Sequence, residues 1–293
     1  MAKISIIGSG VVGTIVGKGF KDLGNDVIFC DVSEKRVREL KSSGFHSTTD
    51  LEEAVKSSDI SFICVPTPVK AGKIDLSYIK SAVEGLGKSL KGKKGYHLVV
   101  VKSTVVPTTT EKFVIPILEK SSGKKVGREI GVCMNPEFLT EIQKTWTKDK
   151  EFTKDFFTED RIVIGEFDKK SGVALQKLYE PLKIPIFRAN LRTAEMIKYA
   201  ANCCLLSRIS YWNEIFLICE KMGIDAQRVA DIVALDKRIG RYGTVLGKAA
   251  GGKCLEKDIT AFISGIKGIH EPELLKAVLD INLYMAKKYG RRE

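Results

Sequence analysis

Histidine is scarce in this sequence, and the cysteines lack the spacing of a metal site. The three histidines, His46, His97 and His270, lie far apart, which leaves little material for a histidine-based metal site or a Ser–His triad. The seven cysteines are odd in number and form no CxxC pair. We therefore expect no metal and no disulfide framework, and reduced thiols of a cytosolic protein fit better.

The sequence also lacks a long hydrophobic run and a signal peptide. No apolar run reaches the roughly 20 residues that a membrane-spanning helix needs. The N-terminal stretch MAKISIIGSG carries a lone lysine and no cleavage pattern, so it is typical of a first β-strand. We expect a cytoplasmic protein that does not act in the membrane, and its 293 residues suffice for two domains.

The formal net charge is +12, but no recognised nucleic-acid-binding motif accompanies it. The lysines are scattered or stand in short runs such as KSLKGKK, without aromatic residues between them. Solvated helix faces, or attraction of a polyanionic small molecule such as a dinucleotide, explain this charge better than nucleic acid does. We therefore expect no nucleic-acid partner.

Short β-branched runs alternate with amphipathic helical stretches through the first part of the chain. The predicted strands are KISIIG, DVIFC, ISFICV, HLVVVK, IGVCM and RIVIG. The predicted helices between them lie near residues 11–23, 34–42, 50–57, 76–90 and 108–121. Apolar strands that are each followed by a helix-length connection predict a parallel sheet covered on both faces, which is a doubly wound α/β domain.

The pattern changes near residue 190. Residues 191–222 contain no glycine or proline, and Gly223 follows as a C-terminal stop, so a single long helix is predicted. Its nearly uncharged middle indicates burial on most sides, and further helices are predicted near 225–234, 254–267 and 271–289. We expect a Rossmann-like domain at 1–190 and an all-α dimerisation domain, built on the long helix, at 191–293.

The first predicted strand runs straight into a glycine-rich turn, Gly8-Ser9-Gly10-Val11-Val12-Gly13. A GxGxxG pattern at a strand-to-helix turn, with an acidic residue at the end of the next strand, is the fingerprint of a dinucleotide site. Here that residue is Asp31, which would accept hydrogen bonds from the adenosine ribose. Its charge disfavours the extra phosphate of NADP, which Arg36 could accept, and we expect NAD as the cofactor.

Two further strand ends belong to the same region. The third and fourth strands end at Val65-Pro66-Thr67 and at Ser103-Thr104. Because ligands of an open parallel sheet bind beyond the carboxyl ends of its strands, both turns are expected near the cofactor.

Lys198 and Asn202 lie four residues apart on the long helix and therefore on one face of it. One interpretation is structural, with a lysine that reaches solvent and an asparagine bonded to the backbone. The other is catalytic, with an ammonium and an amide that stabilise a developing oxyanion. The spacing alone supports both.

Cys254 follows a glycine pair and begins a predicted helix, which distinguishes it from the other six cysteines, all in predicted strands or in the long helix. A helix N-terminus favours the thiolate and can lower its pKa below the ~8.5 of an ordinary thiol. Lys257 could assist electrostatically, and Asp258, one turn on, could act as a base or an orienting carboxylate.

A dinucleotide site and an activated thiol together suggest covalent aldehyde oxidation. The thiolate adds to an aldehyde, the adduct gives a hydride to NAD, and water cleaves the resulting thioester. That water needs a base, and Glu137, at another strand end, is the candidate.

These motifs, in this order, resemble the UDP-glucose/GDP-mannose dehydrogenase family over nearly the whole chain. The motifs are GSGVVG, DVSEKRV, VPTP, KSTVVP, NPEFLTE, DRIVIG, AEMIKYAANCCLLSRISYWNE, LDKRIG and GGKCLEKD. The resemblance implies a four-electron oxidation of a sugar-nucleotide C6 alcohol to a uronic acid with two NAD in turn, most like the oxidation of UDP-glucose to UDP-glucuronate in polysaccharide biosynthesis.

The resemblance also implies roles for individual residues. Cys254 would be the nucleophile, Lys198 and Asn202 would stabilise the oxyanion, and Asp258, Glu137 and Thr104 would position or activate water. Arg36 would contact the adenosine ribose, and Arg238 would reach the substrate of the neighbouring subunit in a homodimer built on the long helix. The remaining positions implied at the cofactor are Val11, Val12, Glu141 and Lys257, and those at the substrate are Phe138, Leu139 and Gly251.

Members of that family continue into a second Rossmann-like domain that holds much of the nucleotide, whereas this sequence ends at YGRRE. The alternative to an active dehydrogenase is therefore a non-catalytic or partner-dependent NAD-binding module, completed by a separate cap protein. A β-hydroxyacid dehydrogenase with a similar layout would need no cysteine nucleophile, and Cys254 disfavours it.

Overall fold

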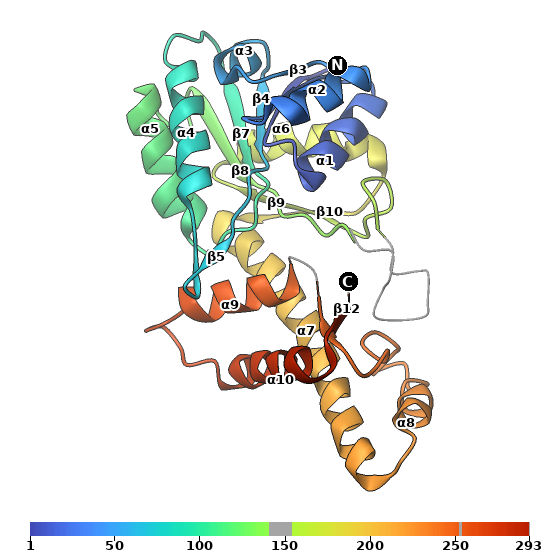
Figure 1. Cartoon of the computed structure of the whole chain (residues 1–293). Coiled ribbons are helices and arrows are strands. Elements are labelled where there is room, and N and C mark those ends of the chain that lie inside the picture. The colour runs from blue at the N-terminus through green and yellow to red at the C-terminus, as the bar shows by residue number, and fades with distance from the viewer. Residues whose placement is uncertain (141–153, 252–253, 293) are drawn as a thin grey trace. The chain divides into compact units, whose positions relative to one another are not determined.

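The computed structural model describes residues 1–140, 154–251 and 254–292, which fall into two compact units. The first unit comprises Met1–Pro68, Asp75–Leu139 and Lys154–Lys198. The second contains Val69–Ile74 and the chain from Tyr199 onward. Figure 1 shows the sheet of the first unit and the helices of the second, which are orange and red.

An eight-stranded sheet forms the centre of the first unit, in the order β10-β9-β8-β7-β4-β1-β2-β3. Its strands are β1 (Lys3–Ile7), β2 (Asp26–Cys30), β3 (Ser47–Thr48), β4 (Ile60–Ile63), β7 (His97–Val101), β8 (Ile130–Met134), β9 (Ile162–Glu166) and β10 (Ile186–Asn190). Neighbouring strands run parallel except β8 and β9, which run antiparallel. The predicted α/β class is confirmed, and the reversal at β9 is a detail that the apolar strand pattern does not encode.

Helices cover both faces of this sheet because alternate side chains of a strand point to opposite faces. The helices are α1 (Val11–Asp22), α2 (Glu34–Ser42), α3 (Leu51–Lys56), α4 (Ser77–Leu90), η1 (Thr110–Val114), α5 (Ile115–Ser122), α6 (Lys169–Tyr179) and η3 (Glu180–Leu182). Ile6 and Val100 pack in a core with α1, α2 and α6. Ile7 and Val101 pack in another with α3, α4 and α5.

The strand order reverses between β1 and β4, because β2 pairs with one edge of β1 and β4 with the other. In an open parallel sheet, ligands bind beyond the carboxyl ends of the strands at such a reversal. The turns that follow β1 and β4 therefore flank the expected binding crevice.

The long helix α7 (Leu191–Met222) begins in the first unit and continues into the second. It has the predicted bounds, and Gly223 follows it with a φ of +69°. The other helices of the second unit are α8 (Ala226–Val233), α9 (Leu255–Gly265) and α10 (Glu273–Tyr289). The region also contains two short strand pairs, β5 (Val69–Lys70) with β6 (Lys73–Ile74) and β11 (Ala249–Ala250) with β12 (Arg291–Arg292).

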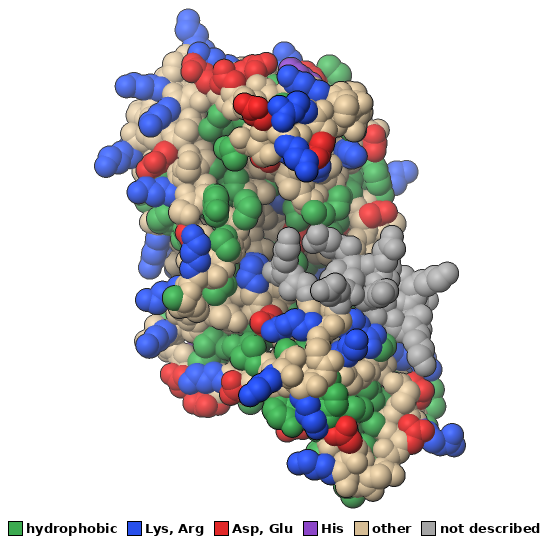
Figure 2. Space-filling model, viewed as in Figure 1, with side chains coloured by type: hydrophobic (Ala, Val, Ile, Leu, Met, Phe, Trp, Pro, Cys, Tyr) green, Lys and Arg blue, Asp and Glu red, His purple; other side chains and the backbone are tan. Residues whose placement is uncertain are grey.

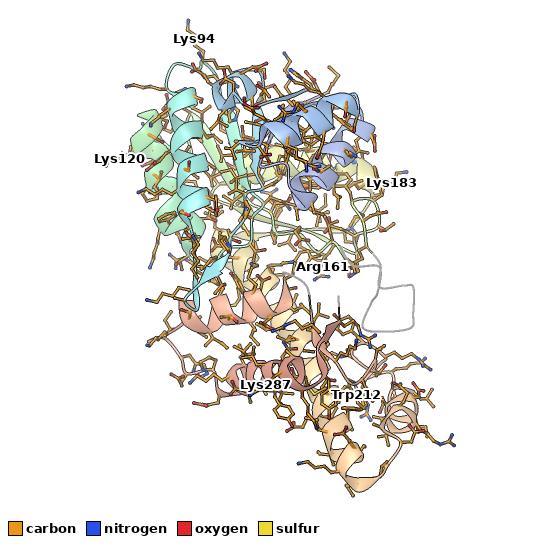
Figure 3. All side chains as sticks on the ribbon, viewed as in Figure 1. Lys94, Lys120, Arg161, Lys183, Trp212 and Lys287 are labelled. Atoms are coloured by element: carbon orange, nitrogen blue, oxygen red, sulfur yellow. The ribbon has the colours of Figure 1, made fainter. Side chains whose placement is uncertain are left out.

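Basic side chains are spread over the visible surface of the first unit, with acidic side chains among them (Figure 2). Lys94, Lys120 and Lys183, for example, extend outward from three different segments (Figure 3). Among the helices of the described residues, none is both long enough and apolar enough to cross a membrane.

Candidate functional site

Two glycines of the turn after β1 are required by the close approach of other backbone atoms. Gly8 has a φ of +91°, and a Cβ atom there would lie 2.9 Å from the carbonyl group of Cys64. A Cβ atom on Gly13 would lie 2.1 Å from the carbonyl oxygen of Gly8. These two glycines therefore permit the tight turn and the close start of α1.

Gly10 differs because it faces open space. Nothing lies within 4 Å of the point where its Cβ atom would stand. Gly10 is the N-cap residue of α1, and no side chain caps that end of the helix. Val11 and Val12 open the helix, so their backbone N–H groups belong to a helix N-terminus that favours an anion. The open space beside Gly10 is room that a pyrophosphate needs and a side chain would fill, so the turn fits a dinucleotide.

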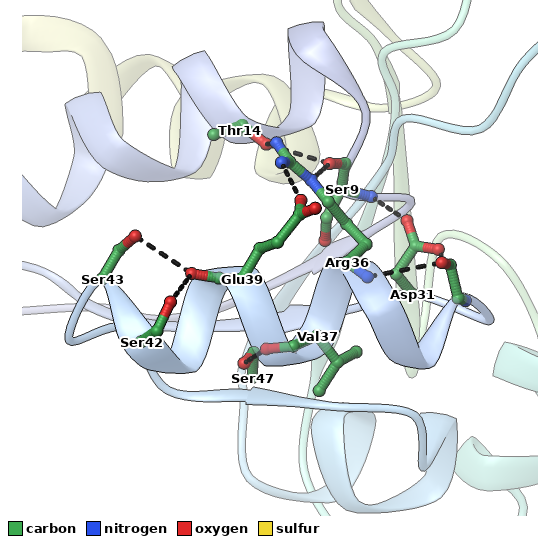
Figure 4. Close-up of polar contacts among 10 residues, drawn as sticks. Ser9, Thr14, Asp31, Arg36, Val37, Glu39, Ser42, Ser43 and Ser47 are labelled. Atoms are coloured by element: carbon green, nitrogen blue, oxygen red, sulfur yellow. Dashed lines mark hydrogen bonds and ion pairs between the residues drawn. The ribbon is translucent and has the colours of Figure 1, made fainter.

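Asp31 and Arg36 bracket this turn on its two sides (Figure 4). The Asp31 carboxylate accepts hydrogen bonds from the backbone N–H groups of Ser9, at 2.7 Å, and Ser33, at 2.9 Å. The Arg36 Nε group donates to the Ser9 carbonyl oxygen at 2.7 Å, and its Nη2 group donates to Thr14 Oγ1 at 2.8 Å. Two predicted cofactor residues thus hold the peptide groups on both sides of Ser9 in the glycine-rich turn.

The turns after β4 and β7 are tied to each other. Thr67 Oγ1 donates a hydrogen bond to the Thr104 carbonyl oxygen at 2.8 Å, and Ser103 Oγ donates to the Val65 carbonyl oxygen at 2.6 Å. Pro66 lies between two of these anchored residues. The structure therefore brings together the predicted residues of both strand ends in the first unit.

A buried carboxylate on α7 holds the continuation of the β7 turn. Glu195 is fully buried and accepts hydrogen bonds from the backbone N–H groups of Thr108, at 2.6 Å, and Thr110, at 2.7 Å. Thr108 has a φ of +80°, a left-handed conformation that costs a residue with a side chain about 1–2 kcal/mol. Glu195 lies one helical turn before Lys198, so α7 fixes this loop and the lysine together.

Lys198 holds the segment that follows β8. Its Nζ atom donates to the Glu137 carbonyl oxygen at 2.6 Å and lies 3.2 Å from Glu137 Oε1. The ammonium group also lies over the Phe138 ring, 5.4 Å from its centroid. The other carboxylate oxygen of Glu137 accepts the Leu139 N–H at 2.8 Å. Lys198 and Glu137 are both buried, so the two predicted catalytic groups form a desolvated ion pair.

A second buried lysine lies under the same segment. The Lys102 Nζ atom donates to Asn135 Oδ1 at 3.0 Å and to the Pro136 carbonyl oxygen at 3.4 Å. Asn135 also accepts the Tyr179 hydroxyl at 2.6 Å and donates to the Val163 carbonyl oxygen at 2.8 Å. Burial lowers the pKa of Lys102, and the nearby Glu159 and Glu137 carboxylates act in the opposite direction.

Glu159 completes this charged group from the loop before β9. It is buried, and its Oε2 atom accepts the Phe138 N–H at 3.3 Å. Burial raises the pKa of Glu159, Lys102 opposes that rise, and the like charge of Glu137 adds to it. The segment 135–139 is thus bonded to three buried charged side chains from three different parts of the first unit, namely Lys102, Glu159 and Lys198.

Cys254 lies at the N-cap position of α9, as predicted, and is half-buried. Its carbonyl oxygen accepts the Asp258 N–H at 2.8 Å, the first hydrogen bond of the helix. Asp258 is 1% exposed, and its Oδ2 atom accepts a hydrogen bond from Asn202 Nδ2 at 2.6 Å. Its Oδ1 atom pairs with Lys257. Within the second unit, the backbone of Cys254 is therefore bonded to Asp258, and the Asp258 carboxylate is bonded to the Asn202 amide.

Two buried asparagines hold the chain that leads to Cys254. Asn213 of α7 donates to the Lys248 carbonyl oxygen at 2.9 Å and accepts the Gly247 N–H at 3.1 Å. Asn282 of α10 accepts the Ala250 N–H at 2.8 Å and donates to Glu256 Oε2 at 2.9 Å. Residues 247–250 and the first turn of α9 are therefore bonded to α7 and α10.

The remaining cysteines have surroundings that suppress thiolate formation or lie away from this group. Burial raises the pKa of Cys30, Cys64 and Cys203 to about 12 and raises that of Cys133 further. Cys219 is buried in α7, and Cys204 is exposed on it. No disulfide joins any of the seven, all of which lie in the described residues.

Arg238 and Gly251 are the remaining predicted residues that the structure describes. Arg238 is exposed and forms an ion pair with Asp236, at 2.7 Å between Nη2 and Oδ2. Gly251 is buried after β11. Glu141 lies outside the described residues.

Sequence reasoning missed several polar residues that hold the predicted ones. These are Thr14, Glu39, Asn135, Glu159, Glu195, Asn213 and Asn282. The signal that could have found Glu195, Asn213 and Asn282 is a polar side chain on the apolar face of a predicted helix, because such a group needs a partner. Thr14 and Glu39 carry no comparable signal, since polar residues are ordinary on exposed helix surfaces.

Both parts of the chain match one family of known proteins. Residues 2–47 and 41–183 match the NAD binding domain of the UDP-glucose/GDP-mannose dehydrogenase family, and residues 192–284 match its central domain.

Individual relatives agree with this match. UDP-glucose 6-dehydrogenase TuaD of Bacillus subtilis strain 168 is 38% identical over an alignment that covers 96% of this chain and 63% of the relative. GDP-mannose 6-dehydrogenase of Pseudomonas syringae pathovar tomato is 39% identical, over 88% of this chain and 63% of the relative. This chain thus spans 63% of the length of both. A solved UDP-glucose dehydrogenase from Pyrobaculum islandicum superimposes with a TM-score of 0.88 at 36% identity, covering 98% of this chain and 69% of that one.

Proposed function

Because the chain belongs to the UDP-glucose/GDP-mannose dehydrogenase family, we propose that it oxidises the C6 alcohol of a sugar nucleotide to the carboxylate with NAD as the oxidant. The observation that carries the proposal is the Cys254 group, in which a thiol begins a helix one turn before a buried aspartate bonded to Asn202. A thiol in this setting can form a covalent intermediate with an aldehyde.

NAD, when bound, accepts one hydride at each of the two oxidation steps, so two molecules are reduced for each sugar. The residues that would hold it are the glycine-rich turn, Asp31, and the paired turns after β4 and β7. The open space beside Gly10 supports the pyrophosphate position, and the hydrogen bonds that fix Ser9 support a turn already shaped for binding.

Cys254 acts after the first hydride has left and the alcohol has become an aldehyde. Its sulfur forms a bond to C6, and the carbonyl oxygen becomes a thiohemiacetal hydroxyl after taking a proton. The second hydride leaves C6 of this adduct, the hydroxyl proton is released, and a thioester results. Water then forms a bond to C6, the C–S bond breaks, and the thiol and the carboxylate are released.

Lys198 and Asn202 supply positive charge and an N–H group to the oxygen on C6 while it carries negative charge. Asn202 uses one amide hydrogen to hold Asp258, and its amide group has two. Asp258 orients or deprotonates the water that cleaves the thioester. Glu137, paired with Lys198, and Thr104 position that water.

UDP-glucose is the first substrate to test and GDP-mannose the second, since both substrates are named among the relatives. The assay is NADH formation at saturating NAD with a limiting amount of sugar nucleotide. We expect two NADH per sugar, formation of the uronic acid, and near-complete loss of turnover in Cys254→Ser.

Cys204→Ser is the matched control, because Cys204 is an exposed thiol on α7 outside the Cys254 group. We expect it to keep the activity of the unmodified chain. Measurable NAD binding without turnover of any sugar nucleotide would contradict the proposal. It would favour the alternative of an NAD-binding module that works with a separate partner.

A further inference from the structure

The Arg36 side chain of α2 lies where it could decide between two nicotinamide cofactors. NADP differs from NAD by a phosphate on the 2′ oxygen of the adenosine ribose, and an arginine near the acidic residue of this fold is the group that accommodates such a phosphate. Arg36 lies beside the glycine-rich turn that Asp31 holds from the other side (Figure 4). Its own hydrogen bonds determine whether it is available.

All three nitrogen atoms of the Arg36 guanidinium already donate to an acceptor. The Nε and Nη2 groups donate to the Ser9 carbonyl oxygen, at 2.7 Å, and to Thr14 Oγ1, at 2.8 Å. The Nη1 group donates to Glu39 Oε2 at 3.0 Å. A phosphate binds arginine most strongly through two parallel N–H groups of one edge. Three of the five N–H groups of Arg36 therefore already have acceptors, and the edge formed by Nε and Nη2 is fully occupied.

Glu39 also adds a negative charge one turn along α2 from Arg36. A 2′-phosphate carries close to two negative charges at neutral pH, so the Glu39 carboxylate and the Asp31 carboxylate would both repel it. NAD presents only a hydroxyl there. Asp31 can accept from that hydroxyl, because its two present hydrogen bonds leave lone pairs on a carboxylate that has about four.

We propose that Glu39 and Thr14 are specificity-determining residues for the cofactor, because they hold Arg36 against the glycine-rich turn and deny it to a 2′-phosphate. The matched domain of the family is an NAD binding domain, and the contacts of Arg36 with Glu39 and Thr14 are the part of its preference for NAD that we assign here. This inference concerns cofactor binding alone and does not depend on the oxidation proposed above.

The test is calorimetric titration of the full chain with NAD and with NADP in buffer of low ionic strength. We expect the unmodified chain to bind NAD at least tenfold more tightly than NADP. Glu39→Gln removes one charge and turns a charge-assisted hydrogen bond to Nη1 into a weaker neutral one, so NADP affinity should rise about fivefold, while NAD affinity stays within about twofold. Adding Thr14→Val to this variant should raise NADP affinity further, to about tenfold over the unmodified chain.

Glu34→Gln is the matched control, because Glu34 lies on the same helix and forms an exposed ion pair with Arg38 at 3.2 Å. It removes the same charge without touching Arg36, and we expect less than a twofold change for either cofactor. Partly exposed pairs of this kind contribute little to folding, so thermal unfolding of both variants should match that of the unmodified chain.

Three results would overturn the proposal. The first is equal affinity of the unmodified chain for both cofactors, or no binding of NAD. The second is a ratio of NADP to NAD affinity that stays unchanged in Glu39→Gln and in the double variant. The third is an equal rise in NADP affinity in Glu34→Gln, which would make net charge rather than the Arg36 contacts responsible. Absence of sugar oxidation would leave these titrations unaffected and would bear only on the proposed function.

Discussion

Gly10 and Gly13 are two residues of one motif with different physical requirements. A methyl group on Gly10 would meet nothing within 4 Å, whereas one on Gly13 would lie 2.1 Å from a backbone oxygen. We therefore predict that Gly10→Ala keeps the stability of the unmodified chain but loses NAD binding, because the methyl group enters the space that the pyrophosphate needs. Gly13→Ala should instead lower the free energy of unfolding by more than about 2 kcal/mol, because backbone must move.

Urea unfolding without ligand, followed by NAD titration, measures both effects. The unmodified chain is the reference, and NAD should raise its unfolding temperature in proportion to the logarithm of the NAD concentration. Normal NAD binding by Gly10→Ala would contradict the assignment of this turn to the cofactor.

His97 is a second residue whose behaviour follows from its surroundings. It is 1% exposed, its Nδ1 atom accepts from the Lys93 ammonium at 3.1 Å, and its Nε2 group bonds Ser61 Oγ at 2.8 Å. Burial, and then the positive charge of Lys93, lower the pKa of His97 to about 3. The folded protein thus holds this imidazole neutral, while the unfolded chain takes up a proton below about pH 6.5.

A lowered histidine pKa means that acid favours the unfolded chain. Stability from this group is present above about pH 6.5 and is lost as the pH falls toward about 3. Between pH 7.5 and 5.5 we predict a loss of about 1.4 kcal/mol in the free energy of unfolding, measured by urea denaturation. His97→Gln should lack this part of the pH dependence. His270→Gln, at an exposed position, should keep it, and an unchanged slope in His97→Gln would refute the assignment.

At the scale of elements, the segment 135–139 depends on buried charges that neutralise one another. Among the neighbouring charges, Glu159 does most to raise the pKa of Lys102 against the effect of burial. Lys102 in turn does most to lower the pKa of Glu159 against the effect of burial. Lys102→Met should lower the free energy of unfolding by about 3 kcal/mol, because it leaves buried carboxylates without compensation. Combining it with Glu159→Gln should cost at least about 1 kcal/mol less than the sum of the single changes.

This double-mutant cycle is measured by urea denaturation of the unmodified chain, the two single variants and the double variant. Lys94→Met is the control, because Lys94 is exposed and extends away from the first unit (Figure 3), and it should change stability by less than about 0.5 kcal/mol. Strict additivity of the Lys102 and Glu159 changes would show that the two side chains do not interact.

Elements with strong periodicity were predictable from the sequence, and short or context-dependent ones were not. The helix 191–222 was found with its bounds, because glycine and proline are absent until Gly223. Residues 47–48 and the hairpin at 69–74 are too short for a repeating pattern, and they form because neighbouring strands or α9 offer partners. The antiparallel direction of β9 depends on pairing with β8, which a single strand does not encode.

In the candidate site too, spacing within one element was predictable from the sequence, and contacts between elements were not. The cysteine, the aspartate one turn on, and the Lys198–Asn202 pair follow from helical spacing within one element. Contacts between elements, such as Asn202 with Asp258 or Glu159 with Phe138, join residues distant in sequence and became visible only in the fold. The functional roles of these residues, and the domain bounds at 190 and 191, stay predictions.

At the scale of the whole molecule, the apolar surface of α7 is compatible with the homodimer that the family resemblance implies. Tyr211 and Ile218 lie seven residues apart and are 54% and 48% exposed, and Met222, four residues on, is 66% exposed. This spacing places the three side chains on one face of the helix. We predict a particle of twice the 32.4 kDa chain mass in light scattering, and a shift to the monomer in Ile218→Lys.

Ile269→Lys is the matched control for this prediction. Ile269 is 82% exposed, lies in the turn between α9 and α10, and offers no helical face for pairing. The same substitution there should leave the dimer intact. A monomer in the unmodified chain at micromolar concentration, or a dimer in Ile218→Lys, would contradict a dimer built on α7.

The protonated state of the buried cysteines has a practical use. A protein with seven thiols is ordinarily a poor subject for site-specific labelling, but alkylating reagents at neutral pH need both access and thiolate. Burial denies both to most of these side chains, which leaves the exposed Cys204 and the half-buried Cys254 as the accessible positions. A single Cys204→Ser change therefore turns the chain into a carrier of one fluorescent or spin probe, attached where the proposed chemistry occurs.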